Sequence, residues 1–379
     1  MRPLQTKLLV SLTLFTMLFT ACKKDDIPQP GKPLPSPVVN PVPVPNPNPS
    51  ETSFTIKLKT VITIGSIVYD SIPAVLTLSS WDSSGTEHKK VLNMNAGANS
   101  ISLLKKHVKF SFRVNQWSLS DELTLTKDEI KEGETYVLGG AKAAKRLIKE
   151  EEYLFAAGAY QPSSKSFYTY NADGSLQQID FYQKKPQSQE LKKYNVDKFI
   201  YTAGKLDKIQ RYDDKGAAVS YTGFSYNAAN KIENMEQKGY GQETYAYVEY
   251  NGGMQPSINI DYLYNNGQAM SYTMNFVGGN KVKETAMSST GGSEGGTFGY
   301  DLNINPYVHM NWPDIFLSKS SKNNMISQQK GYAGGFPVAE PYKFEYTYDA
   351  DGYPVELVKS YKSYTTGEHL YKTKTVYTY

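Results

Sequence analysis

One short pattern repeats through the C-terminal part of the chain, and it constrains the fold more than any other feature. Each copy begins with two aromatic residues that are separated by one other residue. A turn of Asn, Asp or Gly follows, then two aliphatic residues three positions apart. Clear copies begin at Tyr168, Phe199 and Phe224, and another strong copy contains Tyr346 and Tyr348. An internal repeat of this kind is typical of folds built from one recurring supersecondary unit.

Each copy predicts a β-hairpin. Aromatic residues alternate with polar ones on both arms, and Asn, Asp and Gly accept the positive φ angles of a tight turn. The chain has 31 Tyr, of which only Tyr69 and Tyr136 precede residue 150. We therefore expect residues 144–379 to form an antiparallel β-meander of repeated hairpins, a curved or partly closed sheet lined by Tyr.

The preceding segment, 51–143, has a different β pattern. Short runs such as Phe54-Thr55-Ile56-Lys57-Leu58 alternate apolar and polar residues, and turn signals such as 82–85 and 95–99 separate them. Short strands at this spacing predict a small β-sandwich, immunoglobulin-like or prealbumin-like, so the expected fold class is all-β. Residues 141–151 carry good helix formers and predict either a short linking helix or the lead-in to a strand.

The first 21 residues have the features of a signal peptide. Arg2 and Lys7 are basic, and the apolar run that follows ends at Phe19. This run is too short to cross about 30 Å of hydrocarbon as a helix. We therefore expect residues 1–21 to be removed on export.

Residues 19–22 end in the only cysteine of the chain, Cys22, and resemble a bacterial lipobox. That resemblance implies a lipid anchor, with palmitate among its acyl chains, on Cys22. The next four residues, Lys23, Lys24, Asp25 and Asp26, resemble the export signal of Bacteroidetes lipoproteins that are displayed on the cell surface. The implied location is the outer membrane, lipid-anchored and exposed at the cell surface. The rest of 22–50 is rich in Pro and predicts an extended linker.

The Tyr-rich repeats also carry a family resemblance. The segment Tyr348-Asp349-Ala350-Asp351-Gly352 resembles the YD repeats of RHS-type shell proteins. Residues 144–379, with the lipobox and the Pro-rich linker before them, look like Bacteroidetes lipoprotein domains of unknown function that are described as having a porin-like fold. The resemblance implies a β architecture and an envelope location, and it implies no known activity.

The long irregular insert between the repeats is the first place to look for a ligand site. Trp312 lies there, away from the repeat, with Tyr307 and His309 close by in the sequence. Aromatic faces stack on sugars, and insertions in regular scaffolds often carry function. We predict Trp312, Tyr307 and His309 as candidate ligand-binding residues.

Composition argues against several function classes. The net charge of +4 is small for a nucleic-acid binder, and one Cys with four His leaves little for a metal centre. We expect no cofactor, no metal and no catalytic residue. Residues 291–295 match G-x-S-x-G but have no helix pattern behind them, so a hairpin loop is the better interpretation.

The sequence thus predicts a non-catalytic binding or structural protein of the bacterial surface, held in the membrane through Cys22. A surface glycan or a protein is the expected partner. Two alternatives stay open. The C-terminal Tyr377-Thr378-Tyr379 is typical of strands in an integral outer-membrane barrel, although charged runs such as 191–195 would break a lipid-facing band. A glycan-active hydrolase is the other alternative, and no group of residues points to its site.

Overall fold

The protein is described here from a computed structural model, and in the residues that it describes all regular structure is β apart from two short 3₁₀ turns. The structure describes residues 53–184, 190–252, 256–310, 321–332, 339–362 and 369–379.

The N-terminal part of the described chain forms two four-stranded sheets. In the first, β1 pairs with β2 and β5 on one side and runs parallel to β8 on the other. The second has the order β4-β3-β6-β7. The bounds are β1 Ser53–Ile64, β2 Ile67–Asp70, β3 Ala74–Asp82, β4 Glu87–Met94, β5 Asn99–Leu104, β6 His107–Gln116, β7 Leu119–Thr126, η1 Lys127–Glu129 and β8 Thr135–Lys142.

Both sheets turn their apolar positions toward one core. Ile56 and Leu58 of β1 and Phe110 and Phe112 of β6 are fully buried in the same cluster. The alternation read from the sequence produces this arrangement, because successive side chains of a strand point to opposite faces.

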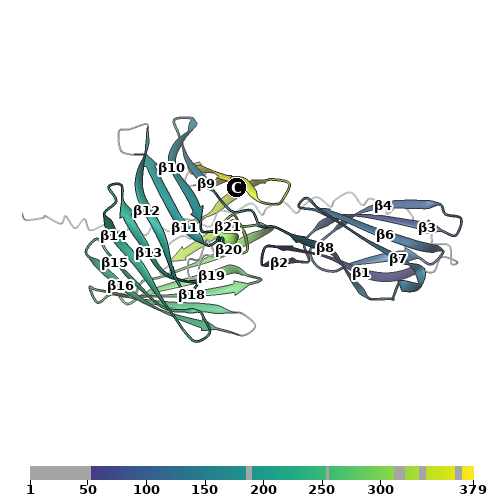
Figure 1. Cartoon of the computed structure of the whole chain (residues 1–379), viewed down its shortest axis with the longest axis horizontal. Helices are drawn as coiled ribbons and strands as arrows, with labels where there is room; N and C mark the ends of the chain where they lie inside the picture. Colours follow the sequence, from purple (N-terminus) through teal and green to yellow (C-terminus); the bar gives the residue numbers. More distant parts are fainter. Residues whose placement is uncertain (1–52, 185–189, 253–255, 311–320, 333–338, 363–368) are drawn as a thin grey trace, which may run out of the picture. The chain divides into compact units, whose positions relative to one another are not determined.

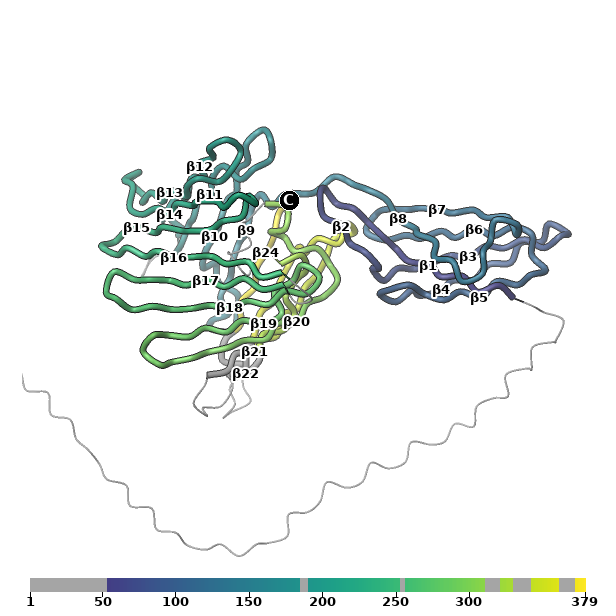
Figure 2. Tube along the Cα trace, turned by 90° about the horizontal axis from the view of Figure 1, so that it is seen from below, coloured from purple at the N-terminus to yellow at the C-terminus, as the bar shows by residue number. Residues whose placement is uncertain are grey.

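The rest of the described chain forms one closed antiparallel barrel of sixteen strands (Figures 1 and 2). Its strands are β9 Lys149–Ala156, β10 Ala159–Tyr170, β11 Leu176–Lys184, β12 Leu191–Thr202, β13 Lys205–Asp213, β14 Ala218–Tyr226, β15 Ile232–Gly239, β16 Gln242–Asn251, β17 Ser257–Tyr264, β18 Ala269–Val277, β19 Asn280–Ser288, β20 Ser293–Ile304, β21 Asn323–Tyr332, β22 Ala339–Tyr348, β23 Pro354–Lys362 and β24 His369–Thr378. The short turn η2, Val308–Met310, lies between β20 and β21.

The closed barrel corrects the predicted architecture. Neighbouring hairpins do pair in sequence order, but β24 also pairs with β9, from Thr373 opposite Leu154 to Thr378 opposite Lys149. This last pairing leaves no free edge, so the barrel is the main architecture of the chain. The prediction of a small sandwich followed by a curved or partly closed sheet is therefore wrong.

The segment before β9 does not form the short linking helix that was one of its two predicted structures. Residues 143–148 have no regular structure and lead directly into β9, so no linking helix forms in 141–151. Strand β9 is paired on both sides, with β10 and with β24. Those two ladders override the helix propensity of the sequence.

Tyrosine hydroxyl groups connect successive copies of the repeat by hydrogen bonds. The second aromatic residue of a copy lies inside the barrel and donates its hydroxyl to a backbone carbonyl of the preceding unit. The bonds run from Tyr170 to Leu147 at 2.7 Å, from Tyr201 to Leu176 at 3.0 Å and from Tyr226 to Leu206 at 2.8 Å. Each ring also packs against the barrel core, so one residue type fills the interior and ties neighbouring hairpins together.

Candidate functional site

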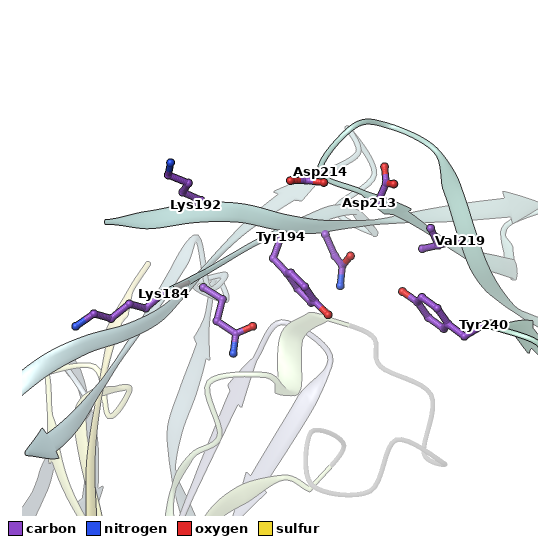
Figure 3. Close-up of a pocket in the computed structure, with 9 residues that line it drawn as sticks. Lys184, Lys192, Tyr194, Asp213, Asp214, Val219 and Tyr240 are labelled. Atoms are coloured by element: carbon purple, nitrogen blue, oxygen red, sulfur yellow. The ribbon is translucent and has the colours of Figure 1, made fainter. Parts of the chain in front are cut away.

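A pocket of about 570 Å³ opens where β11 ends and β12 begins (Figure 3). The turn after β13 and the hairpin between β15 and β16 complete it. Its walls combine aromatic, acidic, basic and amide side chains: Gln183, Lys184, Lys192, Tyr194, Asn195, Asp213, Asp214, Val219 and Tyr240.

Tyr194 reaches the pocket because the strand is irregular at this point. In the β11–β12 ladder Phe181 pairs with Asn195, and the next residue, Tyr182, pairs with Lys193. Tyr194 is therefore the extra residue of a β-bulge, a feature that redirects a side chain. The residue is 54% exposed, so its ring is accessible from solvent.

Tyr240 is presented by a strained hairpin turn. The two residues between β15 and β16 are Tyr240 and Gly241, with φ angles of 51° and 75°. Such turns favour Asn, Asp or Gly at the first position, and a bulky residue with positive φ is an outlier. The side chain is 70% exposed, so packing does not compensate for the strain. Strain of this kind is concentrated at functional sites.

The two tyrosines face each other. Figure 3 shows their hydroxyl ends converging across the pocket, whereas Lys184 and Lys192 extend away from them. The arrangement offers two accessible aromatic faces with hydroxyl groups between them.

A two-bond ion pair on the inner side of the barrel lies near this pair of rings. Arg211 donates two hydrogen bonds of 2.7 Å to the carboxylate of Asp197, which is 6% exposed. The guanidinium also lies 5.7 Å from the centre of the Phe181 ring. The bond to Asp197 raises the pKa of Arg211, and nearby Tyr240 and Tyr194 add to the rise. Arg211 therefore stays charged close to both pocket tyrosines.

One acidic residue of the pocket, Asp213, has a structural task. The Asp213 carboxylate accepts the backbone N–H groups of Lys215 at 2.9 Å and Ala217 at 2.8 Å. It thereby fixes the turn between β13 and β14.

The predicted site residues lie elsewhere. Tyr307 packs against the barrel core, with its ring 6.4 Å from that of Tyr377, and burial and then Glu150 raise its pKa well above the usual value. His309 is 9% exposed and lies 5.9 Å from Tyr353, and burial lowers its pKa to about 4. Trp312 lies outside the described residues, so a ligand site there stays a prediction.

Cys22 and the charged segment Lys23–Asp26 also lie outside the described residues. Within the described chain, no group of His, Cys, Asp and Glu is placed to hold a metal ion. None of the described helices is long and apolar enough to cross a membrane.

Two pocket residues escaped the sequence analysis, although each left a signal. The segment Gly239-Tyr240-Gly241 puts an aromatic residue where a tight turn favours Asn. At Tyr194 the alternation of the strand is broken by one residue. Both signals are deviations from the repeat that lie outside the long insert.

Comparisons with known proteins add little to this description. No family model and no curated protein matches the chain. Among solved structures, a porin-like protein from Bacteroides uniformis is similar over 61% of this chain and 97% of its own length. Its TM-score is 0.44 and its sequence identity is 14%. The closed barrel described here is established by the strand pairing of this chain itself.

Proposed function

We propose that this protein is a non-catalytic component of the bacterial cell envelope that captures a glycan between Tyr194 and Tyr240. The observation that carries the proposal is the presentation of both rings by irregular backbone. A bulge and a strained turn each cost stability, yet both deliver an exposed aromatic ring to the same pocket.

A glycan fits this pocket better than an apolar ligand does. Sugar rings present C–H faces that pack on aromatic rings, and their hydroxyl groups need donors and acceptors nearby. Asn195 and Gln183 supply amide groups beside the two tyrosines. A pocket of about 570 Å³ has room for a short oligosaccharide.

We place the barrel outside the bilayer, tethered through the lipid on Cys22. The outward positions of five neighbouring strands form a continuous row of Glu249, Asn259, Thr273, Thr285 and Gly295. A lipid-facing barrel needs an apolar band about 25 Å tall. The row runs from strand to strand around the barrel without one apolar side chain, so this part of the outer face is suited to water.

A second candidate, an integral outer-membrane barrel, is favoured by the closure itself. Full closure is the architecture that this alternative requires, and sixteen strands are typical of porins. Exposed apolar residues such as Phe155, Leu263 and Met287 also lie near the pocket end of the barrel. The outward row described above still favours the tethered arrangement.

The binding proposal is tested with the full chain in mild detergent on a glycan array, followed by calorimetry with the best ligand. Tyr240→Asn removes the ring and inserts a residue that tolerates the turn. We expect it and Tyr194→Ala each to weaken binding about tenfold, the typical effect of truncating a central aromatic contact.

Tyr247→Ala is the matched control. Tyr247 lies on β16, is 60% exposed and does not line the pocket. Its loss should leave the affinity unchanged. Equal affinity in all three variants would rule out the pocket, and chemical turnover of a bound glycan would rule out the non-catalytic assignment.

A further inference from the structure

Strand β4 carries charged and polar side chains on its core-facing side. In the β3–β4 ladder, Leu92 pairs with Leu76 and both pack in the core. Two and four residues earlier on the same side, the core-facing positions hold Lys90 and His88, opposite Leu78 and Ser80. The hydrophobic alternation therefore breaks at one end of the strand.

A groove of about 370 Å³ opens at this break. Among the described residues, β4 pairs only with β3 and β5 pairs only with β1, so the groove lies between the free edges of the two sheets. Its floor is apolar, made of Leu78, Leu103 and Phe110 from the buried core. Lys90 and His88 form part of its wall.

The wall has more positive than negative charge. The His88 ring stacks on that of His107, with centres 4.8 Å apart. The nearby carboxylates already have partners, since Asp82 lies 3.4 Å from His88 and Glu87 lies 3.3 Å from Lys89. The Lys90 ammonium forms no ion pair or hydrogen bond within the described part of the chain. One cation on the groove wall is thus left for a ligand.

We propose that this groove binds the phosphate headgroup of an anionic lipid. Lys90 would hold the phosphate, and the first carbons of the lipid would lie on Leu78 and Leu103. Phosphate bound by cations gives the strong charge-assisted part of such recognition. The apolar floor explains why the ligand is an amphiphile and not a free anion.

The position of the groove supports a lipid source. Ser53, the first residue of β1, pairs with Leu104 at the groove, and the Lys105 ammonium lies 5.1 Å from the Phe54 ring. Ser53, where the described chain begins, therefore lies beside the groove. This step uses the proposed attachment through Cys22, whereas the ligand test below does not depend on it.

The test is calorimetry of the full chain in mild detergent with short-chain lipids below their micelle concentration. We expect saturable binding of dihexanoyl phosphatidylglycerol and none of dihexanoyl phosphatidylcholine. Lys90→Gln should weaken the binding by at least about tenfold, as expected for one charge-assisted contact. Lys57→Gln, at an exposed outward position of β1, is the matched control and should bind like the unchanged protein.

The affinity for inorganic phosphate distinguishes a lipid headgroup from free phosphate as the source of the anion. Phosphate that binds as tightly as the lipid would overturn the lipid assignment. A Lys90→Gln protein with unchanged melting temperature and unchanged affinity would overturn the site, and so would the absence of any lipid binding. The latter would agree with a role of Lys90 in protecting the free edge of β4 from pairing with other chains. None of these outcomes bears on the barrel pocket, because Tyr194 and Tyr240 are not part of the groove.

Discussion

At the scale of single residues, Tyr240 combines local strain with exposure. Its φ of 51° costs energy that no packing returns. Asn tolerates this conformation, so Tyr240→Asn should raise the free energy of unfolding by about 1 kcal/mol. Urea denaturation of the two proteins measures the difference. A destabilised Tyr240→Asn protein would contradict the idea that the ring is kept for binding at the expense of stability.

Residue-scale features were the hardest to predict from the sequence. The aromatic residues of the repeat were assigned correctly to hairpins, because their period and their turns are local signals. Tyr194 and Tyr240 are two among the many tyrosines of this part of the chain, and residue type does not distinguish them from the core tyrosines. Only the exact register of two ladders shows that they lie in the pocket. Register depends on pairing with neighbouring strands, which alternation alone does not determine.

At the scale of elements, ion pairs connect the turn between β22 and β23 to the last residue of β8 and to the segment that follows it. The Asp351 carboxylate lies 3.1 Å from the ammonium of Lys142 and 2.5 Å from that of Lys145. The bond to Lys145, followed by that to Lys142, lowers the pKa of Asp351 to about 2. This contact joins elements that are far apart in the chain.

The lowered pKa gives a pH-dependent prediction. The carboxylate is ionised in the folded protein between pH 2 and the unfolded pKa of about 3.9, so its contribution is present above pH 4 and lost as the pH falls toward 2. Asp351→Asn should therefore lower the free energy of unfolding by about 1 kcal/mol at pH 7, a value reduced by solvent screening. The difference from the unchanged protein should vanish near pH 2.

Urea denaturation at both pH values provides this measurement. Asp128→Asn, in the exposed turn η1, serves as the control and should have little effect at either pH. A deficit of Asp351→Asn that persists at pH 2 would show that the carboxylate charge is not the cause.

Closure of the barrel gives a second prediction about elements. Deleting β24, His369–Thr378, exposes one edge of β23 and one of β9. Free edges pair with other chains, so the shortened protein should aggregate or form oligomers. Light scattering after size-exclusion chromatography detects this. A monomer with an unchanged melting temperature would show that the closing ladder contributes little.

The closing ladder also marks the limit of prediction for the fold. Thr378 and Lys149 are partners although they lie 229 residues apart. No local sequence pattern in either strand predicts that the two strands pair. In contrast, the residues that form each hairpin lie within one repeat. The sequence therefore predicts neighbouring pairs well and leaves the pairing of the first and last barrel strands open.

At the scale of the whole molecule, the lipid-tethered barrel and the integral membrane barrel should partition differently between a detergent phase and an aqueous phase. In Triton X-114 the tethered protein should partition into the detergent phase only while its lipid is present. Palmitate labelling should therefore be lost in Cys22→Ser, and a chain lacking residues 1–50 should stay in the aqueous phase. Recovery of that shortened chain in the detergent phase would favour the integral barrel, whose contact with lipid does not depend on Cys22.

The distance between the two closing strands has a consequence for when the barrel forms. A chain that crosses a membrane from its N-terminus delivers β9 long before β24, and the ring cannot close until both are present. Pairing across so many residues is slow, because the entropy of the intervening chain must be lost before the contacts form. The hairpins in between can assemble one after another while translocation continues. For the exported chain that we propose, the topology orders the two events in time, because the ring can close only after β24 has followed β9 across the membrane.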